Sequence, residues 1–447
     1  MSGYLCHVRQ VPERLDLARS AAALTITTFA GIALVFLTSV VVSRALGPEG
    51  KGVYDLMVAT ASLGGLALGL SLPAGITYAV ARGTLSAASV APGAIAISIA
   101  IGLGSFAILT AGREAAVAIA TLAPDSGLLD AGLISALAAI SALGAMLRAA
   151  LAGGGRVVLG ARLDVIGRGA ALLATAALAP GATPVSLVLA VLIGGSIGAV
   201  AEATFLQPRG FPAVGAVRGL VTYSLRAHGA NVIQFLNYRL DLFLVGFFRG
   251  PSEVGLYALA GTLGQLVWVV SGSVAGSLFP AVAADADPSR SPSLTAAAAR
   301  LTTALSLAIA VTGALLAVPG LRIVYGPDFV PAVMPLLVLL PGIVSLVPTR
   351  VIAAYFAGIG RPNLNLIISA LSFVATVGLD LALIPSHGMV GAAVASTASY
   401  VVGSVAGLVM FQTVSGVPAY RAVVPGRSDL LLLAEAIRIG GHKGRDR

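Results

Sequence analysis

The segment GPEGKGVY occupies residues 47–54, and a similar segment, GPSEVGLY, occupies residues 250–257. Both copies match Gly-Pro-x-x-x-Gly-(Val/Leu)-Tyr, and each copy follows a long apolar segment. Glycine and proline end one helix and begin the next, and tyrosine is favoured at a membrane interface. We therefore interpret the motif as a hairpin turn rather than as a substrate contact. Its fixed positions are Gly47, Pro48, Gly52 and Tyr54 in the first copy and Gly250, Pro251, Gly255 and Tyr257 in the second.

The composition around the motif is that of a membrane protein. Of the 447 residues, 57% are hydrophobic and only 10% are charged, and the mean hydropathy is +0.98. Soluble domains carry about 25% charged residues. Crossing a bilayer as a helix takes about 20 apolar residues, a length reached by segments such as Ala21–Val42 and Val90–Thr110. The sequence thus predicts an all-α polytopic membrane protein.

The apolar pattern predicts twelve membrane spans. The segment Leu430–Ile439 is too short to cross and is expected to be an interfacial amphipathic helix or part of a disordered tail. The predicted spans cover residues 20–43, 55–80, 88–111, 128–151, 157–179, 184–206, 228–248, 255–279, 298–318, 331–356, 364–385 and 388–412.

The longest polar break between the middle spans divides the chain into two halves. Six spans in each half give the halves parallel topology, an arrangement found in transporters that work by alternating access. We expect an N-terminal cytoplasmic segment (1–19), an N-lobe (20–206), an inter-lobe loop (207–227), a C-lobe (228–412) and a basic C-terminal tail (413–447).

The net charge of +9 is explained by orientation in the membrane. Most arginines and lysines between the predicted spans fall on the side of the two termini, which places both termini in the cytoplasm. We expect no nucleic-acid partner. The single cysteine, Cys6, cannot form a disulfide framework, and the four histidines are scattered without metal-ligand spacing. We expect neither a metal nor a cofactor.

Five segments, by their order along the chain, resemble polysaccharide transporters. These are the O-antigen and teichoic acid flippases of the multidrug/oligosaccharidyl-lipid/polysaccharide exporter superfamily. With the spans between them they cover most of residues 20–412. Peptidoglycan lipid flippases of this superfamily usually have fourteen spans, whereas twelve are predicted here, and Asp380 stands where a neutral polar residue is expected. The segments are Ser43–Tyr54, Tyr238–Asp241 with Gly250–Ala260, Tyr325–Phe329, Gly358–Pro362 and Leu383–Ala393.

The resemblance implies a flippase in the bacterial cytoplasmic membrane. Such a protein moves a polyprenyl-diphosphate-linked oligosaccharide from the cytoplasmic to the outer leaflet for surface polysaccharide biosynthesis. A polysaccharide polymerase and glycosyltransferases would be its partners in the pathway.

A few charged and polar residues inside the predicted spans are candidates for substrate binding, because charges at membrane depth are costly and tend to face a cavity or a partner. Arginine forks bind phosphate oxygens, so we hypothesise that Arg239 and Arg168 contact the diphosphate. Asn231, Gln234 and Asn237 could bind sugar hydroxyls. Asn231, Gln234, Tyr238 and Asp241 form a stripe on span seven, for which packing between helices remains the alternative. Near Arg168 on span five, anchoring at the membrane interface remains the alternative for Arg162 and Asp164. The candidates are Arg239, Asp241, Asn231, Gln234, Tyr238, Arg168 and Arg350.

Three alternatives to a flippase remain open. A cation-coupled multidrug-extrusion transporter would use the acids in the spans, namely Asp241, Glu202 and Asp380. A membrane enzyme has little support, because no P-loop motif occurs and the connections are too short for a nucleotide-sugar domain. We therefore expect that the chain is not an enzyme. A scaffold without transport activity is the third alternative.

Overall fold

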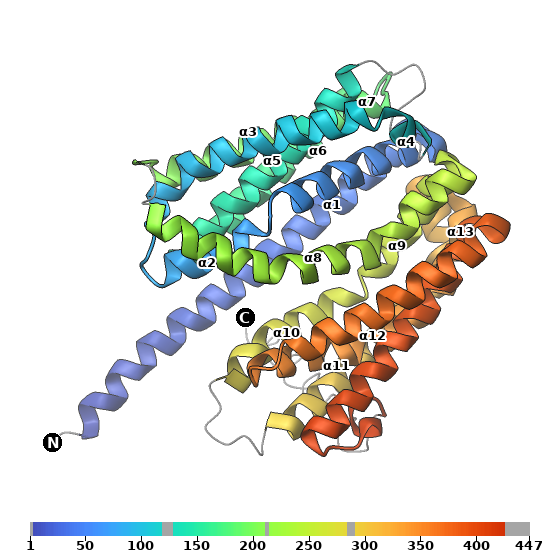
Figure 1. Cartoon of the computed structure of the whole chain (residues 1–447). Coiled ribbons are helices and arrows are strands. Elements are labelled where there is room, and N and C mark those ends of the chain that lie inside the picture. The colour runs from blue at the N-terminus through green and yellow to red at the C-terminus, as the bar shows by residue number, and fades with distance from the viewer. Residues whose placement is uncertain (1–2, 119–127, 211–213, 284–290, 425–447) are drawn as a thin grey trace, which may run out of the picture. The chain divides into compact units, whose positions relative to one another are not determined.

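The computed structural model describes residues 3–118, 128–210, 214–283 and 291–424. Within these ranges every regular element is a helix (Figure 1), which confirms the predicted all-α class. The tail segment 430–439 lies outside the described residues. The helix α1 (Gly3–Leu68) begins well before the first predicted span.

The described chain forms two compact units. The first comprises Met1–Phe235 and Arg249–Gly255, and the second comprises Leu236–Phe248 and Leu256–Arg447. The helix α8 (Val214–Arg249) begins inside the loop expected at residues 207–227 and contributes to both units. The division therefore falls later in the chain than the expected lobe boundary.

The first unit is organised around the helix α5, which contacts α1, α2, α3 and α7. Small residues let neighbouring helices approach closely, as expected for helices in a membrane. A Cβ atom on Gly167 in α6, for example, would lie only 3.0 Å from the carbonyl oxygen of Gly194 in α7. The helices after α1 are α2 (Leu72–Ala81), α3 (Ala87–Ala111), α4 (Arg113–Ala118), α5 (Leu128–Gly153), α6 (Val157–Leu178) and α7 (Pro184–Leu206).

The predicted span 55–80 is interrupted in the structure. The helix α1 ends at Leu68, and α2 begins at Leu72. Between them Leu70 and Ser71 have positive φ angles of 48° and 53°, a conformation that is uncommon for residues other than glycine. Pro73 disfavours helical geometry in the residue before it and lacks the N–H of a helix interior. This proline was the sequence signal for the break.

The two copies of the Gly-Pro motif have the same local geometry. Gly47 has a φ angle of 65° at a kink inside α1, and Gly250 has a φ angle of 84° immediately before α9 (Pro251–Gln265). Positive φ at both positions explains why each copy starts with glycine. The first copy lies at a kink within one helix, and at the second copy α8 ends and α9 begins; the hairpin turn stays a prediction.

The second unit is organised around the helix α12, which packs against α10, α11 and α13. The helix α13 is kinked at Gly388, where φ is 57°. A π-helical segment (Leu321–Tyr325) and a 3-10 helix (Pro327–Ala332) connect α11 to α12. The remaining helices are α10 (Trp268–Ala283), α11 (Ser291–Gly320), α12 (Val333–Gly358), α13 (Asn363–Ser415) and a 3-10 turn (Ala419–Ala422).

Seven of the described helical segments are long and apolar enough to cross a membrane, or eight if the bent pair α9–α10 is one span. The chain is thus a multi-pass membrane protein, while the count of twelve spans stays a prediction. Two of the seven segments contain the kinks at Gly47 and Gly388. The helix α6 coincides with the predicted span 157–179, and α8 contains the predicted span 228–248, but neither helix is among the seven.

Candidate functional site

An arginine and three aromatic rings form a cluster in the second unit. The guanidinium carbon of Arg350 lies 4.6 Å from the centroid of the Trp268 ring, within the range of a cation–π interaction. The Trp268 indole N–H donates to the carbonyl of Ile343 at 2.9 Å, which fixes the ring. Tyr238 and Tyr400 pack against Trp268 with centroid distances of 5.5 and 5.6 Å. These contacts hold Arg350 in one orientation.

The held guanidinium keeps unused hydrogen-bonding capacity. Nη1 of Arg350 donates to the hydroxyl of Tyr238 at 3.4 Å, whereas Nε is buried and has no hydrogen-bond partner. An unsatisfied buried donor is uncommon, and this one is available to an acceptor. Arg239 lies beside this cluster, on the wall of a small cavity of about 30 Å³ that Tyr238 and Trp268 also line. Tyr238 thus contacts Arg350 and lines the same cavity as Arg239.

The predicted residue Asp241 belongs to a buried polar network on another wall of the same cavity. The carboxylate is only 5% exposed. Its Oδ2 accepts hydrogen bonds from the hydroxyl of Tyr257 and, at 3.0 Å, from that of Ser396. Tyr257 closes the second copy of the Gly-Pro motif. It is buried in this network, and its position at a membrane interface stays a prediction.

A second acid, Asp380 on α13, lies near Asp241. Asp380 is fully buried, and neither of its carboxylate oxygens has a hydrogen-bond partner. It is close enough to Asp241 for the two carboxylates to interact electrostatically. Two neighbouring buried carboxylates repel one another unless a proton or a cation lies with them. Within the described residues no group of three or more His, Cys, Asp or Glu side chains could hold a metal.

A different charged cluster joins three helices of the first unit. Nη1 of Arg148 on α5 lies 3.2 Å from Oδ1 of Asp164 on α6 and 2.9 Å from Oε1 of Glu202 on α7. Nε of Arg168 lies 2.6 Å from Oδ2 of Asp164. Two arginines and two acids give the cluster no net charge at neutral pH.

This cluster changes the interpretation of Arg168, which we predicted to contact a diphosphate. One face of its guanidinium is engaged by Asp164, although 42% of the side chain is exposed. Glu202 is fully buried, and its Oε2 has no hydrogen-bond partner. The sequence indicated only the Asp164–Arg168 pair, through its i,i+4 spacing. The contributions of Arg148 and Glu202 come from tertiary packing and carried no local signal.

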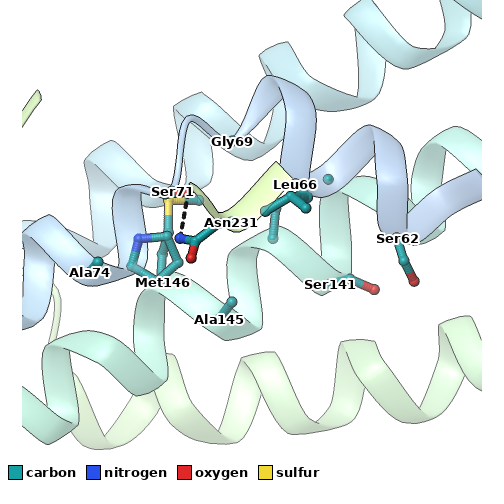
Figure 2. A pocket seen from close by; sticks show the side chains of 12 residues that line it. Ser62, Leu66, Gly69, Ser71, Ala74, Ser141, Ala145, Met146 and Asn231 are labelled. Carbon is teal, nitrogen blue, oxygen red and sulfur yellow. Dashed lines mark hydrogen bonds between the residues drawn. The ribbon is translucent and has the colours of Figure 1, made fainter. Parts of the chain in front are cut away.

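Two of the three predicted amide residues, Asn231 and Gln234, lie in the first unit. Asn237 lies in the second unit, where it is buried and its Oδ1 accepts a hydrogen bond from the hydroxyl of Thr376 at 2.9 Å. The Asn231 side-chain amide donates to the hydroxyl of Ser71 at 3.0 Å (Figure 2), and His228 Nδ1 lies 3.3 Å from the same hydroxyl. Gln234 is exposed. The seven predicted residues therefore divide into two groups. Tyr238, Arg239, Asp241 and Arg350 lie in the second unit, and Asn231, Gln234 and Arg168 lie in the first.

Two curated proteins of Haloferax volcanii are similar to this chain. "Probable low-salt glycan biosynthesis flippase Agl15" is 25% identical over 402 residues, which cover 88% of this chain and 82% of that protein. "Probable flippase AglR" is 28% identical over 179 residues, which cover 37% of this chain and 36% of that protein. The match to AglR thus spans little more than a third of either protein.

Two kinds of solved transporter share the fold. A multidrug resistance MATE family transporter of the MOP superfamily in an inward-facing conformation matches with a TM-score of 0.73 and 17% identity, over 86% of this chain and 94% of that chain. The lipid II flippase MurJ in an inward closed conformation matches with a TM-score of 0.70 and 14% identity, over 88% of this chain and 89% of that chain. At these identities the likeness concerns the fold alone.

The family comparison covers both copies of the Gly-Pro motif and the Arg239–Asp241 segment. A model described as "Polysaccharide biosynthesis protein" matches residues 41–334 of this chain, which is more than half of its length. The chain therefore belongs to this polysaccharide biosynthesis protein family.

Proposed function

We propose that this protein is a lipid-linked glycan flippase that moves a polyprenyl-diphosphate-linked oligosaccharide from the cytoplasmic to the outer leaflet of the cytoplasmic membrane by alternating access. The glycan is then used for cell-surface polysaccharide biosynthesis, and both termini lie in the cytoplasm. Membership of the polysaccharide biosynthesis family and the names of the two Haloferax relatives support this proposal. Glycosyltransferases would act before it in the pathway, and a polymerase would act after it.

The observation that supports an anionic substrate is the position of the Arg350 guanidinium. It stacks on Trp268, its Nε has no hydrogen-bond partner, and Arg239 lies on the wall of the adjoining cavity. A diphosphate supplies anionic oxygens to which arginines donate strong, charge-assisted hydrogen bonds. Aromatic rings such as Tyr238, Trp268 and Tyr400 give flat apolar faces with polar edges, which suit a sugar ring. An anionic head carrying a glycan satisfies both kinds of group.

The buried acids Asp241 and Asp380 offer a means of coupling transport to an ion. Their repulsion is relieved when a proton or a monovalent cation binds between them. A conformation in which the two carboxylates separate would release that ion. Uptake and release of the ion would thus shift the balance between transporter conformations.

A cation-coupled multidrug transporter is the second candidate. The same two acids favour it, because a cationic drug would be attracted to them. The similarity in fold to a MATE transporter and to MurJ is nearly equal and does not separate the candidates. The Nε donor of Arg350, which has no hydrogen-bond partner, favours an anionic substrate.

Deletion of the gene in its own organism tests the proposal. We expect loss of a surface polysaccharide and accumulation of its lipid-linked precursor in the cytoplasmic leaflet, both restored by the wild-type gene. Restoration should fail with Arg239→Ala. If the deletion strain keeps its surface glycans and instead becomes sensitive to cationic drugs, the multidrug candidate is correct and the flippase proposal is wrong.

A further inference from the structure

A cavity of the first unit lies beside the break between α1 and α2 (Figure 2) and measures about 450 Å³. This volume falls within the roughly 300–1,000 Å³ typical of ligand pockets. Its walls come from α1, α2, α5 and α8. Leu66, Ala74, Ala145 and Met146 are among the lining side chains, and Asn231 is the lining residue from α8.

The chemistry of the lining excludes the polar parts of the proposed substrate. Most of the lining surface is apolar, and none of the lining residues is Asp, Glu, Lys, Arg or His. A diphosphate would find no cation here to balance its charge, and a sugar would leave most of its hydroxyls without partners. A hydrocarbon chain, by contrast, loses only its contact with water or with other lipid chains.

One end of the cavity is polar and conformationally strained. Ser71 adopts a left-handed conformation with φ of 53°, a strain that proteins retain where the surroundings impose it, often at functional sites. Its hydroxyl accepts the hydrogen bond from Asn231 and lies 3.3 Å from His228 Nδ1. Broken helices of this kind line the substrate sites of many transporters. The cavity therefore combines a mostly apolar lining with an uncharged polar group at Ser71 and Asn231, and Ser62 and Ser141 add two hydroxyls elsewhere along the wall.

We propose that this cavity binds the first isoprene units of the polyprenyl tail, with the polar end at Ser71 and Asn231 facing the end of the tail that carries the diphosphate. The proposal rests on the proposed flippase function and adds that part of the tail leaves the lipid and enters the protein. Methyl branches on an isoprenoid chain need recesses along the wall. The wall provides such space where the lining residue has no side chain or only a methyl group, as at Gly65, Gly69, Ala74 and Ala145.

Photolabelling of the purified full-length protein in lipid nanodiscs tests the proposal. The probe is geranylgeranyl monophosphate that carries a diazirine, and the labelled peptides are identified by mass spectrometry. We expect label on α1 near Leu66 and on α5 near Ala145. Excess unlabelled geranylgeranyl monophosphate should compete, whereas inorganic diphosphate and dodecyl phosphate, which supply only a headgroup and a straight chain, should not.

Variants that fill the cavity make the test specific. Ala145→Phe and Ala74→Phe place a ring in the cavity from two different helices and should each lower labelling at least tenfold. Ala107→Phe on the exposed face of α3 is the matched control and should label like wild type. Three results would each overturn the proposal. They are label at other sites in the wild-type protein, equal competition by dodecyl phosphate, and full labelling of a variant that folds with a phenylalanine in the cavity. The deletion strain remains the separate test of the flippase function, so a mislocated label with a confirmed glycan defect would reject the cavity alone.

Discussion

Gly52 and Gly255 pack against one another reciprocally. A Cβ atom added to Gly52 would overlap the carbonyl oxygen of Pro251, and one added to Gly255 would overlap the carbonyl oxygen of Pro48. The contact is therefore mutual: the glycine of each Gly-Pro motif packs against the proline carbonyl of the other motif. This exchange explains why residues 249–255 cluster with the first unit. It also gives the shared glycine of the motif a packing role that a turn alone would not require.

Replacing either glycine with alanine should destabilise the protein. Overpacking of a close contact costs about 1–3 kcal/mol, so Gly52→Ala and Gly255→Ala should each lower the thermal unfolding temperature in detergent. Because both substitutions push apart the same two helices, the double variant should lose less stability than the sum of the single losses. Gly313→Ala is the matched control, since a Cβ there meets no atom within 4 Å. Unchanged unfolding of both single variants would contradict the reciprocal packing.

Arg350→Lys should impair transport while leaving the fold intact. Lysine keeps the charge but loses the planar fork that stacks on Trp268 and presents several donors. We expect at least a tenfold fall in the rate at which the lipid-linked precursor is cleared from the cytoplasmic leaflet. The matched control is Arg361→Lys, because Arg361 is exposed. Equal clearance by the Arg350→Lys variant and wild type would remove Arg350 from the proposed substrate site.

The class of fold was predictable from the sequence because it depends on long apolar runs, which are local. The break at residues 69–71 was readable from Pro73, yet the hydropathy of residues 55–80 obscured it. The number of spans is harder to establish. Charged residues such as Asp164 and Arg239 lower the apolarity of α6 and α8, and the kinks at Gly47 and Gly388 leave helices continuous across two predicted spans.

The candidate site was predictable only in part. Helical spacing along α8 placed Tyr238 and Asp241 on one stripe, and the structure brings both to the same cavity with Arg239. Their partners Trp268, Tyr400 and Asp380 are far away in the sequence, and no periodic pattern connects them to α8. The same holds for the bonds from Tyr257 and Ser396 to Asp241. Which charges neutralise one another is decided by tertiary packing and not by spacing.

Asp380→Asn should abolish ion-coupled transport without lowering thermal stability. The substitution preserves the shape of the side chain and removes a buried carboxylate that has no hydrogen-bond partner, so thermal stability should be unchanged or higher. Ion-coupled transport should be lost, because the asparagine neither binds a proton nor balances a cation. Reconstituted proteoliposomes with an imposed proton or sodium gradient would measure this, with the exposed Asp328→Asn as control. Full gradient-driven transport by Asp380→Asn would exclude the pair as the coupling site.

Glu202→Ala should destabilise the first unit. The substitution leaves Asp164 as the remaining ion-pair partner of Arg148, and it opens space where α7 packs against neighbouring helices. Loss of a charge-assisted hydrogen bond costs about 1–3 kcal/mol, and partial exposure of Arg148 places the expected loss at the lower end of that range. Glu202→Gln keeps a hydrogen-bond acceptor for Arg148 and should recover most of the stability. Thermal unfolding of the two variants measures the difference.

If Gln and Ala destabilise the protein equally, the negative charge of Glu202 matters more than its hydrogen bond. If neither variant changes the unfolding temperature, the ion cluster has no structural role, and its four side chains become candidates for function instead.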